Sequence, residues 1–334
     1  MRVFRGKNIN EVFDIAVLNL RDEYGWIKMD SRNGEVLMFC EPITSVYEFP
    51  NERVLFNPQR NCNPFFHFIE GLWMIDGRND LETLTMFAKK MADFSDDGVL
   101  VNGAYGHRWR EWFGRDQLEE AIGLLRQNPL DRRVVLQMWD ASKDLASLSK
   151  DVPCNTQVFF KCRPLPHEEN TYILDMTVTN RSNDLIWGAY GANAVHFSML
   201  HEYVASMCGF ILGTYYQVSN NAHVYQDVWQ PLNHKLPHRI GIDEYAVPDM
   251  HPEPLVDKWE VFDTELRIFF DWLHEGDLFG YKYKNSVFSR TAIPMVEAWW
   301  LYKEGLLGDA VGKANLIKAP DWRKACVEWI ERKR

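Results

Sequence analysis

The sequence predicts an α/β (α+β) fold whose sheet lies mostly in the middle of the chain, with helices before and after it. The first observation is a series of strand-like segments after residue 130, one of which, 172–179, alternates apolar and polar residues. A period of two is typical of a strand with one buried face. The second is helical spacing of apolar residues on both sides of that series. The third is composition: 46% hydrophobic and 25% charged residues in 334 exclude bulk disorder.

Helical patterns dominate the first 130 residues. Asn10 is a typical N-cap, and Asn63 and Pro64 begin a short, very apolar segment, FFHFIEGLWMI. Residues 102–110 contain two glycines and read as a hinged aromatic loop. The helices that periodicity predicts here cover 10–20, 65–75, 80–92 and 115–127.

The middle of the chain supplies the sheet. Residues 189–208 are small, apolar and numerous enough for a buried central helix, and 221–229 also read as helical. Apolar and alternating segments predict strands over 133–139, 156–162, 172–179 and 211–218.

Residues 230–255 hold five prolines and several histidines, so we expect a surface excursion or an insertion there. Helices are predicted over 256–275, 292–304 and 321–333. No repeat or long linker divides the chain. We therefore expect a single domain over 1–334, with 230–334 as its C-terminal portion.

The net charge, the apolar runs and the cysteine content argue against several classes of protein. The net charge of −10 argues against direct nucleic-acid binding, which needs a basic surface. No apolar run reaches the ~20 residues of a membrane span, and the first residues lack a signal-type core, so the cytoplasm is expected. The six cysteines lack metal-ligand spacing. We expect free thiols and no metal.

Three segments carry candidate chemistry, each with a bland alternative. Cys154 follows a proline turn before a strand, where a thiolate could face a cleft; a buried structural cysteine is the alternative. Arg181 and Ser182 lie in NRSND and could clamp a phosphate, or form a polar turn. Glu70 is the one carboxylate in its apolar helix, suited to acid–base work, or a helix-face residue whose tip reaches solvent.

Taken together and in order, the motifs resemble those of thymidylate synthase and its pyrimidine hydroxymethylase relatives. The resemblance covers about residues 8–230, and implies that family's mixed sheet and a single catalytic domain with a divergent portion after residue 230. The segments that carry it are Ser31–Gly34, Glu70–Trp73, Tyr105–Arg110, Asp131–Arg133, Pro153-Cys154, Asn180–Asp184, Gly188, Asn193 and His223–Tyr225.

The resemblance implies the following chemistry. The thiolate of Cys154 attacks C6 of a uracil or cytosine 5′-monophosphate, and C5 then captures the one-carbon unit of the co-substrate 5,10-methylenetetrahydrofolate. Glu70 organises water and moves protons, and Tyr105 and Asn155 complete the catalytic set.

Substrate contacts follow in the same way. Arg32, Arg181 and Ser182 bind the phosphate. Arg132 and Arg133, which could otherwise be a solvated charge pair, reach the partner's phosphate across a homodimer, so that both sites are composite. The remaining contacts are His223 and Tyr225 to the sugar, Asn193 to the base, and Asp184 and Gly188 to the folate.

Four departures from the family pattern bear on the product. Asn155 replaces the usual histidine, and the segment from Gly188 to Asn193 is one residue longer than usual. Met91 and Phe94 stand where synthases have tryptophans. The apolar tail that closes over folate in synthases resembles 317–320 here, but a basic helix follows it.

A looser site favours water over hydride at the final step. We therefore expect hydroxymethylation of dUMP, since the amide of Asn193 matches uracil. The alternatives are reductive methylation of dUMP to dTMP, hydroxymethylation of dCMP or CMP, and an idle nucleotide-binding homologue. Modified pyrimidines of this kind occur in phage DNA, so a phage-encoded enzyme acting in the host cytoplasm would fit.

Overall fold

The structure is a computed structural model that describes residues 1–21, 25–236, 238–276 and 281–333. The strands of these residues form one mixed sheet in the order β1-β4-β8-β7-β6-β5, and the hairpin of β2 and β3 joins it where β3 pairs with β8. The expected α/β fold with a mixed sheet is therefore confirmed. The strands are β1 (Arg2–Gly6), β2 (Trp26–Ser31), β3 (Gly34–Phe39), β4 (Ile43–Tyr47), β5 (Val135–Gln137), β6 (Asn155–Pro164), β7 (Tyr172–Asp184) and β8 (Ile211–Tyr225).

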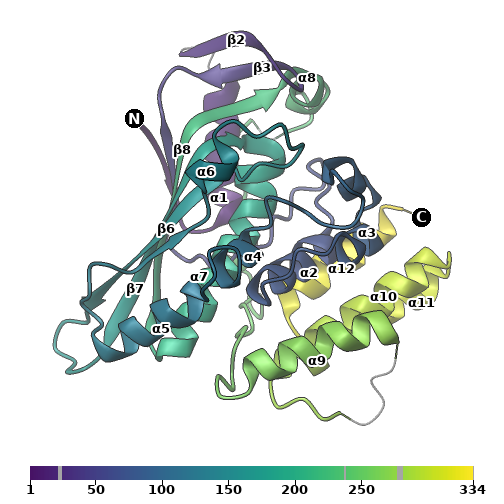
Figure 1. Ribbon diagram of the computed structural model, residues 1–334. Helices are drawn as coiled ribbons and strands as arrows, with labels where there is room; N and C mark the ends of the chain where they lie inside the picture. The colour runs from purple at the N-terminus through teal and green to yellow at the C-terminus, as the bar shows by residue number, and fades with distance from the viewer. Residues whose placement is uncertain (22–24, 237, 277–280, 334) are drawn as a thin grey trace.

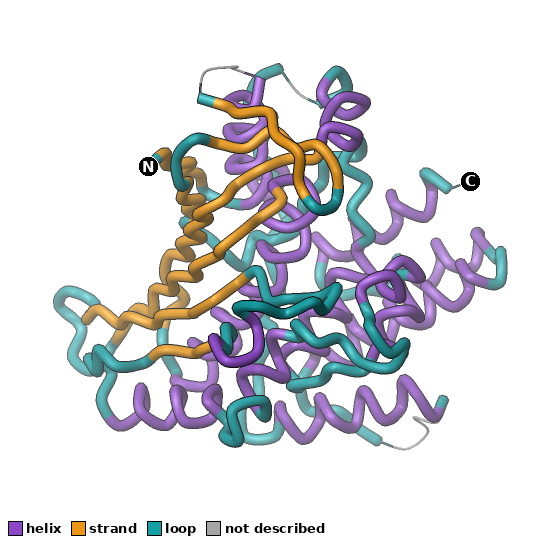
Figure 2. Tube along the Cα trace, turned by 45° about the horizontal axis from the view of Figure 1, so that its top comes forward, coloured by secondary structure: helices purple, strands orange, loops and turns teal. Residues whose placement is uncertain are grey.

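The helices α2, α4, α5 and α7 lie on one side of this sheet, and α9 to α12 lie beyond them (Figures 1 and 2). The helices are α1 (Ile9–Arg21), α2 (Pro64–Ile75), α3 (Leu81–Phe87), α4 (Tyr105–Arg110), α5 (Gln117–Gln127), α6 (Ala141–Asp144), α7 (Asn193–Cys208), α8 (Gln226–Asn233), α9 (Phe262–Glu275), α10 (Ile293–Lys303), α11 (Leu307–Ala314) and α12 (Pro320–Glu331).

A β7–α7–β8 crossover forms the centre of the molecule. β7 and β8 are parallel, so the chain must return along the sheet between them, and α7 is the return. Residues 193–205 of α7 are all buried, so apolar side chains are found around the whole helix, together with buried polar residues such as His196 and His201. The carboxyl ends of β7 and β8 consequently lie side by side at one end of the sheet.

The C-terminal helices pack into the same core as the sheet. The ring of Trp322 on α12 meets Phe68 of α2 edge to face at 5.0 Å, and Trp329 meets Phe65 of α2 at 5.8 Å. Trp299 of α10 packs against Phe65 at 5.5 Å. Aromatic pairs at such distances add stability beyond their buried area. α2, the helix that carries Glu70, is therefore supported from the far side by α10 and α12.

Several boundaries were predicted wrongly; among them, the helix expected over 256–275 begins only at Phe262. Residues 221–225 belong to β8 and only 226–233 are helical, because Val224 and its neighbours pair with β3. Within 102–110, residues 105–110 form helix α4 rather than a loop. Inside 189–208 the helix is interrupted at Gly191, whose φ and ψ of −123° and −107° are not helical, so α7 begins at Asn193.

The short N-terminal strands β1 to β4, together with α6 and α11, were not predicted at all. In the 230–255 segment, most residues lie in loops, but Tyr245 and Leu255 are buried. The hydroxyl of Tyr245 accepts a hydrogen bond from the backbone N–H of Val54 at 3.0 Å. The excursion is thus anchored to the core.

Candidate active site

A hollow of about 460 Å³ lies where β7 and β8 end side by side. Ligands of α/β proteins commonly bind beyond the carboxyl ends of parallel strands, and this volume suits a nucleotide. The hollow brings together six of the residues selected from the sequence. These are Arg32, Cys154, Arg181, Ser182, His223 and Tyr225.

Cys154 lies in the turn before β6, and Arg181 of β7 holds that turn. The guanidinium donates to the carbonyls of Val152 and Pro153, both at 2.9 Å, and its Nη2 lies 3.7 Å from the Cys154 sulfur. Burial raises the pKa of the Cys154 thiol, while Arg181 and Arg32 oppose that rise. A ligand that adds positive charge or donors here would favour the thiolate.

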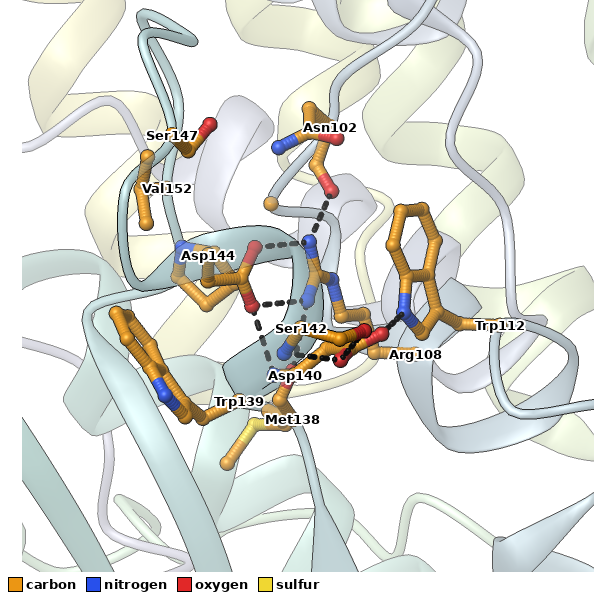
Figure 3. A network of polar contacts seen from close by, with 12 residues as sticks. Asn102, Arg108, Trp112, Met138, Trp139, Asp140, Ser142, Asp144, Ser147 and Val152 are labelled. Atoms are coloured by element: carbon orange, nitrogen blue, oxygen red, sulfur yellow. Dashed lines mark hydrogen bonds and ion pairs between the residues drawn. The ribbon is translucent and has the colours of Figure 1, made fainter.

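A buried ion pair supports the wall of the hollow beside Cys154 (Figure 3). Arg108 of α4 is fully buried, and its guanidinium donates to both carboxylate oxygens of Asp144 in α6, at 2.6 and 3.0 Å. It also donates to the carbonyls of Asn102 and Met138. These hydrogen bonds connect Asn102 with the segment that contains Met138 and Asp144. Arg108 therefore fixes the loop from which Trp139, Asp144 and Ser147 line the hollow.

Behind Cys154 lies a buried polar layer. The backbone N–H of Asn155 points to the hydroxyl of Tyr105 at 3.5 Å. Burial, with the neighbouring Cys154 and Asp151, raises the pKa of Tyr105, so its hydroxyl stays protonated. The Asn155 side chain is fully buried and its Nδ2 donates to Oδ1 of Asn193 at 3.3 Å. Asn193, placed from the sequence by assuming one extra residue, therefore lies next to the nucleophile segment.

Glu70 of α2 faces His196 of α7. Its Oε2 lies 3.0 Å from His196 Nε2 without the alignment of a hydrogen bond. Both atoms are buried and have no other polar partner among the residues that the structure describes. Unpaired buried acceptors are costly, so this pair is poised to bind a water or a ligand group.

The remaining candidates, Asp184 and Gly188, lie at the start of the turn that leads to α7. Oδ1 of Asp184 accepts the backbone N–H of Trp187, whereas its Oδ2 is buried without a partner in the described chain, and burial raises the pKa of this carboxyl. The Trp187 ring is 55% exposed and stacks against the Arg60 guanidinium at 4.3 Å.

Arg132 and Arg133 are not in this hollow. They line a separate surface depression with Asp131, whose carboxylate pairs with the exposed Arg133 at 2.6 Å. The arginines thus face solvent in the single chain, as residues that serve a partner subunit would.

The tail-like segment 317–320 is also placed differently from a mobile lid. Ile317 is fully buried, Ala319 and Pro320 are buried, and the chain continues directly into α12. The expected difference from the synthase tail is therefore structural: this segment is part of the core.

Sequence reasoning missed several residues of the site. Asp144 and Ser147 lie in a segment with no predicted role, and Trp139 ends a predicted strand. Asn183 stands in the motif NRSND without an assigned role, and Gln217 looked like an ordinary polar residue of a strand. No signal in the sequence marks these two amides; the structure distinguishes them because both are polar yet at most 2% exposed. Such groups require hydrogen-bond partners.

The residues that the structure describes contain no cluster of three or more His, Cys, Asp or Glu side chains that could hold a metal ion. Among the same residues, none of the helices combines the length and apolar character needed to span a bilayer.

A thiol held beside a guanidinium, in a nucleotide-sized hollow at the strand ends of a mixed sheet, is an arrangement typical of enzymes that use a cysteine nucleophile. The family model described as thymidylate synthase matches residues 31–284. The chain therefore belongs to the thymidylate synthase family.

Relatives refine this assignment. A deoxyuridylate hydroxymethyltransferase of Pseudomonas phage M6 is 45% identical over 100% of this chain and 95% of its own length. The enzyme of that name from Bacillus phage SP01 is 36% identical over 58% of this chain and 52% of its own length. A putative thymidylate synthase of Methanosarcina mazei is 30% identical over 68% of this chain and 91% of its own length.

Proposed function

We propose that this chain transfers a hydroxymethyl group from methylenetetrahydrofolate to C5 of dUMP. The observation that carries the proposal is the full-length similarity to a phage deoxyuridylate hydroxymethyltransferase, in a chain whose Cys154 faces the hollow beside Arg181. Two phage relatives of the same name also favour action in the cytoplasm of an infected bacterium.

The nucleotide enters with its phosphate toward Arg32, Arg181 and Ser182. A dianionic phosphate replaces the backbone carbonyls that now accept from Arg181, because charge-assisted bonds are stronger than bonds to neutral carbonyls. The rings of His223 and Tyr225 lie edge to face at 5.4 Å and present two polar tips at the opposite wall for the sugar hydroxyl.

The covalent step begins at the sulfur. The Cys154 thiolate forms an S–C6 bond, and the electron pair of the C5–C6 double bond becomes available at C5, which bonds to the carbon delivered by the folate. The C5 proton then leaves, with Glu70 and its water as the acceptor system. When tetrahydrofolate leaves, water adds to the exocyclic carbon, and loss of the sulfur restores the C5–C6 double bond.

The folate supplies the one-carbon unit at the oxidation level of formaldehyde. Asp184, Gly188 and Trp187 would hold its ring. The unpaired Oδ2 of Asp184 can accept a ring N–H, and the exposed face of Trp187 offers stacking area.

Water rather than hydride is favoured as the nucleophile that adds to the exocyclic carbon. Reduction by tetrahydrofolate requires that the folate stay in a closed, dry site. Here three residues of the segment that resembles the synthase tail, Ile317, Ala319 and Pro320, are buried in the core, and the chain continues directly into α12, so this segment is not available to close over the site.

We propose further that the enzyme is a homodimer formed through the open face of the sheet. Val135, Phe159, Thr177 and Tyr216 are neighbours across four strands on that face. Val135 and Phe159 are 36% and 38% exposed. Such a row suits a two-fold interface, which would bring Arg132 and Arg133 to the partner's phosphate.

The second candidate is reductive methylation, favoured by the similarity to putative thymidylate synthases. One incubation separates the two. The purified protein is mixed with dUMP and methylenetetrahydrofolate, and the nucleotide and folate products are identified by mass spectrometry. We expect 5-hydroxymethyl-dUMP with tetrahydrofolate; dTMP with dihydrofolate would contradict the proposal. An idle homologue would bind dUMP without turnover.

A further inference from the structure

We propose that Asn183 and Gln217 set the choice of uracil over cytosine by holding the amide of Asn193 in one orientation. Neither residue belongs to the hollow or to the family motif residues that were assigned a role. The inference rests on the proposed function for the identity of the ligand, a pyrimidine nucleotide.

This set of hydrogen bonds ends at a group that can only accept. The carbonyl oxygen of Ala189 can only accept, and Nε2 of Gln217 donates to it at 3.3 Å. The other end of that amide, Oε1, must therefore face Asn183, whose Nδ2 donates to it at 2.6 Å. The same Nδ2 donates to Oγ of Ser219 at 3.0 Å.

The orientation of Asn183 in turn fixes the orientation of Asn193, the residue proposed to read the base. Because Nδ2 of Asn183 is committed to Gln217, its Oδ1 faces Asn193, and Nδ2 of Asn193 donates to it at 3.1 Å. Oδ1 of Asn193 in turn accepts from Asn155. We call Gln217, Asn183, Asn193 and Asn155 the amide relay.

Burial prevents these amides from adopting another orientation. The four side chains are between 0% and 7% exposed, so water cannot compensate for a mismatch. A flip of Asn193 would place two acceptors 3.1 Å apart toward Asn183 and two donors toward Asn155. Asn155 could flip as well, since its own Oδ1 has no partner in the described chain. Asn183 could not, because Gln217 and Ala189 hold it.

The fixed orientation determines what Asn193 can read. Each amide group retains one further valence: a lone pair on Oδ1 and a hydrogen on Nδ2. Together they match the N3–H donor and the O4 acceptor of uracil. Cytosine offers an N3 acceptor and an amino donor, and would need the flipped amide that the relay forbids.

Gly188 fits the same arrangement. A Cβ at this position would lie 2.7 Å from Oδ1 of Asn183 and 3.4 Å from Nδ2 of Asn193. Because glycine has no side chain, there is room for the hydrogen bond from Asn193 to Asn183 that fixes the orientation of the Asn193 amide. This gives Gly188 a role beside the one expected toward the folate.

The test compares two variants at position 183. Asn183→Leu removes the acceptor that faces Asn193, whereas Asn183→Asp keeps an oxygen there; both variants lose the NH₂ group that donates to Gln217. We measure kcat/KM for dUMP and dCMP. We expect a dUMP preference of about 10²-fold in the wild type, a loss of at least tenfold of that preference in Asn183→Leu, and retention in Asn183→Asp.

A second pair guards against misfolding. Gln217→Met removes the acceptor that orients Asn183, and Gln217→Glu retains it, so the first should lose discrimination and the second keep it. The proposal is overturned if the two members of a pair behave alike while folded, or if the wild type prefers dCMP.

The same comparison is made without turnover. Dissociation constants for dUMP and dCMP are measured by calorimetry on Cys154→Ala proteins that carry each relay variant. Failure of the proposed activity would then leave the binding preference measurable. A preference that ignores the relay variants would overturn this inference alone.

Discussion

The two ends of the nucleotide site are built in different ways. At the phosphate end, Arg32 and Arg181 are exposed and donate to backbone carbonyls that a phosphate can displace. At the base end, Asn155, Asn193 and Asn183 are buried and already hydrogen-bonded to one another. Under the proposed function, the phosphate end supplies affinity and adapts to its ligand, whereas the base end supplies selectivity and is arranged before the ligand arrives.

The largest effect should come from the sulfur that lies between the two ends. Cys154→Ala or Cys154→Ser should lower kcat by about 10³-fold or more, because the adduct at C6 cannot form. Binding of dUMP, followed by calorimetry, should persist, since the phosphate and base contacts lie on other residues. Substantial residual turnover would contradict the assignment of the nucleophile.

The base end is tested directly by Asn193→Asp. A carboxyl group has no NH₂ to offer O4 of uracil, and a proton shared with it can match cytosine. We expect the ratio of kcat/KM for dUMP over dCMP to fall by roughly 10²-fold. An unchanged ratio would show that Asn193 does not read the base.

The phosphate end should behave differently in the same assay. Arg181→Ala should lower kcat/KM by about 10- to 10²-fold for both nucleotides alike, since a charged hydrogen bond to phosphate is indifferent to the base. Arg115→Ala, which breaks an exposed pair with Glu120, is the matched control and should change neither value. A loss of kcat/KM for only one of the two nucleotides would show that Arg181 affects base selectivity, and would contradict the distinction between the two ends.

The composite site predicts recovery of activity in hybrids. When Arg133→Ala and Cys154→Ala chains are co-expressed, half of the dimers combine both, and one of their two sites has an intact Cys154 and an intact Arg133. Activity should recover to about a quarter of the wild-type value. An active monomer in sedimentation would remove the argument for sharing.

The smallest effect lies away from the site. Burial lowers the pKa of His201 on α7 to about 4, although the bond from its Nε2 to the Leu174 carbonyl opposes that shift; its Nδ1 has no partner among the described residues. The unfolded pKa is about 6.5. Between these values the unfolded chain binds the extra proton, so the free energy of unfolding should fall by about 3 kcal/mol as pH drops from 6.5 to 4.

Chemical denaturation across this pH range measures that decline. His201→Gln, which can still donate to the Leu174 carbonyl, should flatten the curve. His251→Gln at an exposed position is the control. If the two variants share the wild-type slope, His201 does not contribute.

The sequence predicted the parts of this protein whose signals are local. Alternation over 172–179 placed β7, and the apolar stretch after residue 189 placed most of α7. The motif residues Cys154, Arg181, His223 and Tyr225 were found because their spacing follows a known family, and the structure gathers them in one hollow.

The parts that the sequence did not predict depend on contacts between distant segments. Residues 221–225 resemble a helix start, and become a strand because β7 pairs with 221–223 and β3 pairs with 223–225. Arg108 reads as one more basic residue until Asp144 meets it in the core. Asn183 and Gln217 are 34 positions apart, and no periodic pattern connects two amides that meet across parallel strands.

The amide relay also constrains how such an enzyme can change over evolutionary time. A replacement at Asn193 alone leaves the oxygen of Asn183 facing whatever follows, so a new side chain there must still bring a proton to it. Positions 183, 193 and 217 are therefore expected to change together. A lineage that exchanges one pyrimidine for the other should show correlated substitutions at these three positions, with intermediates that discriminate poorly between the two bases.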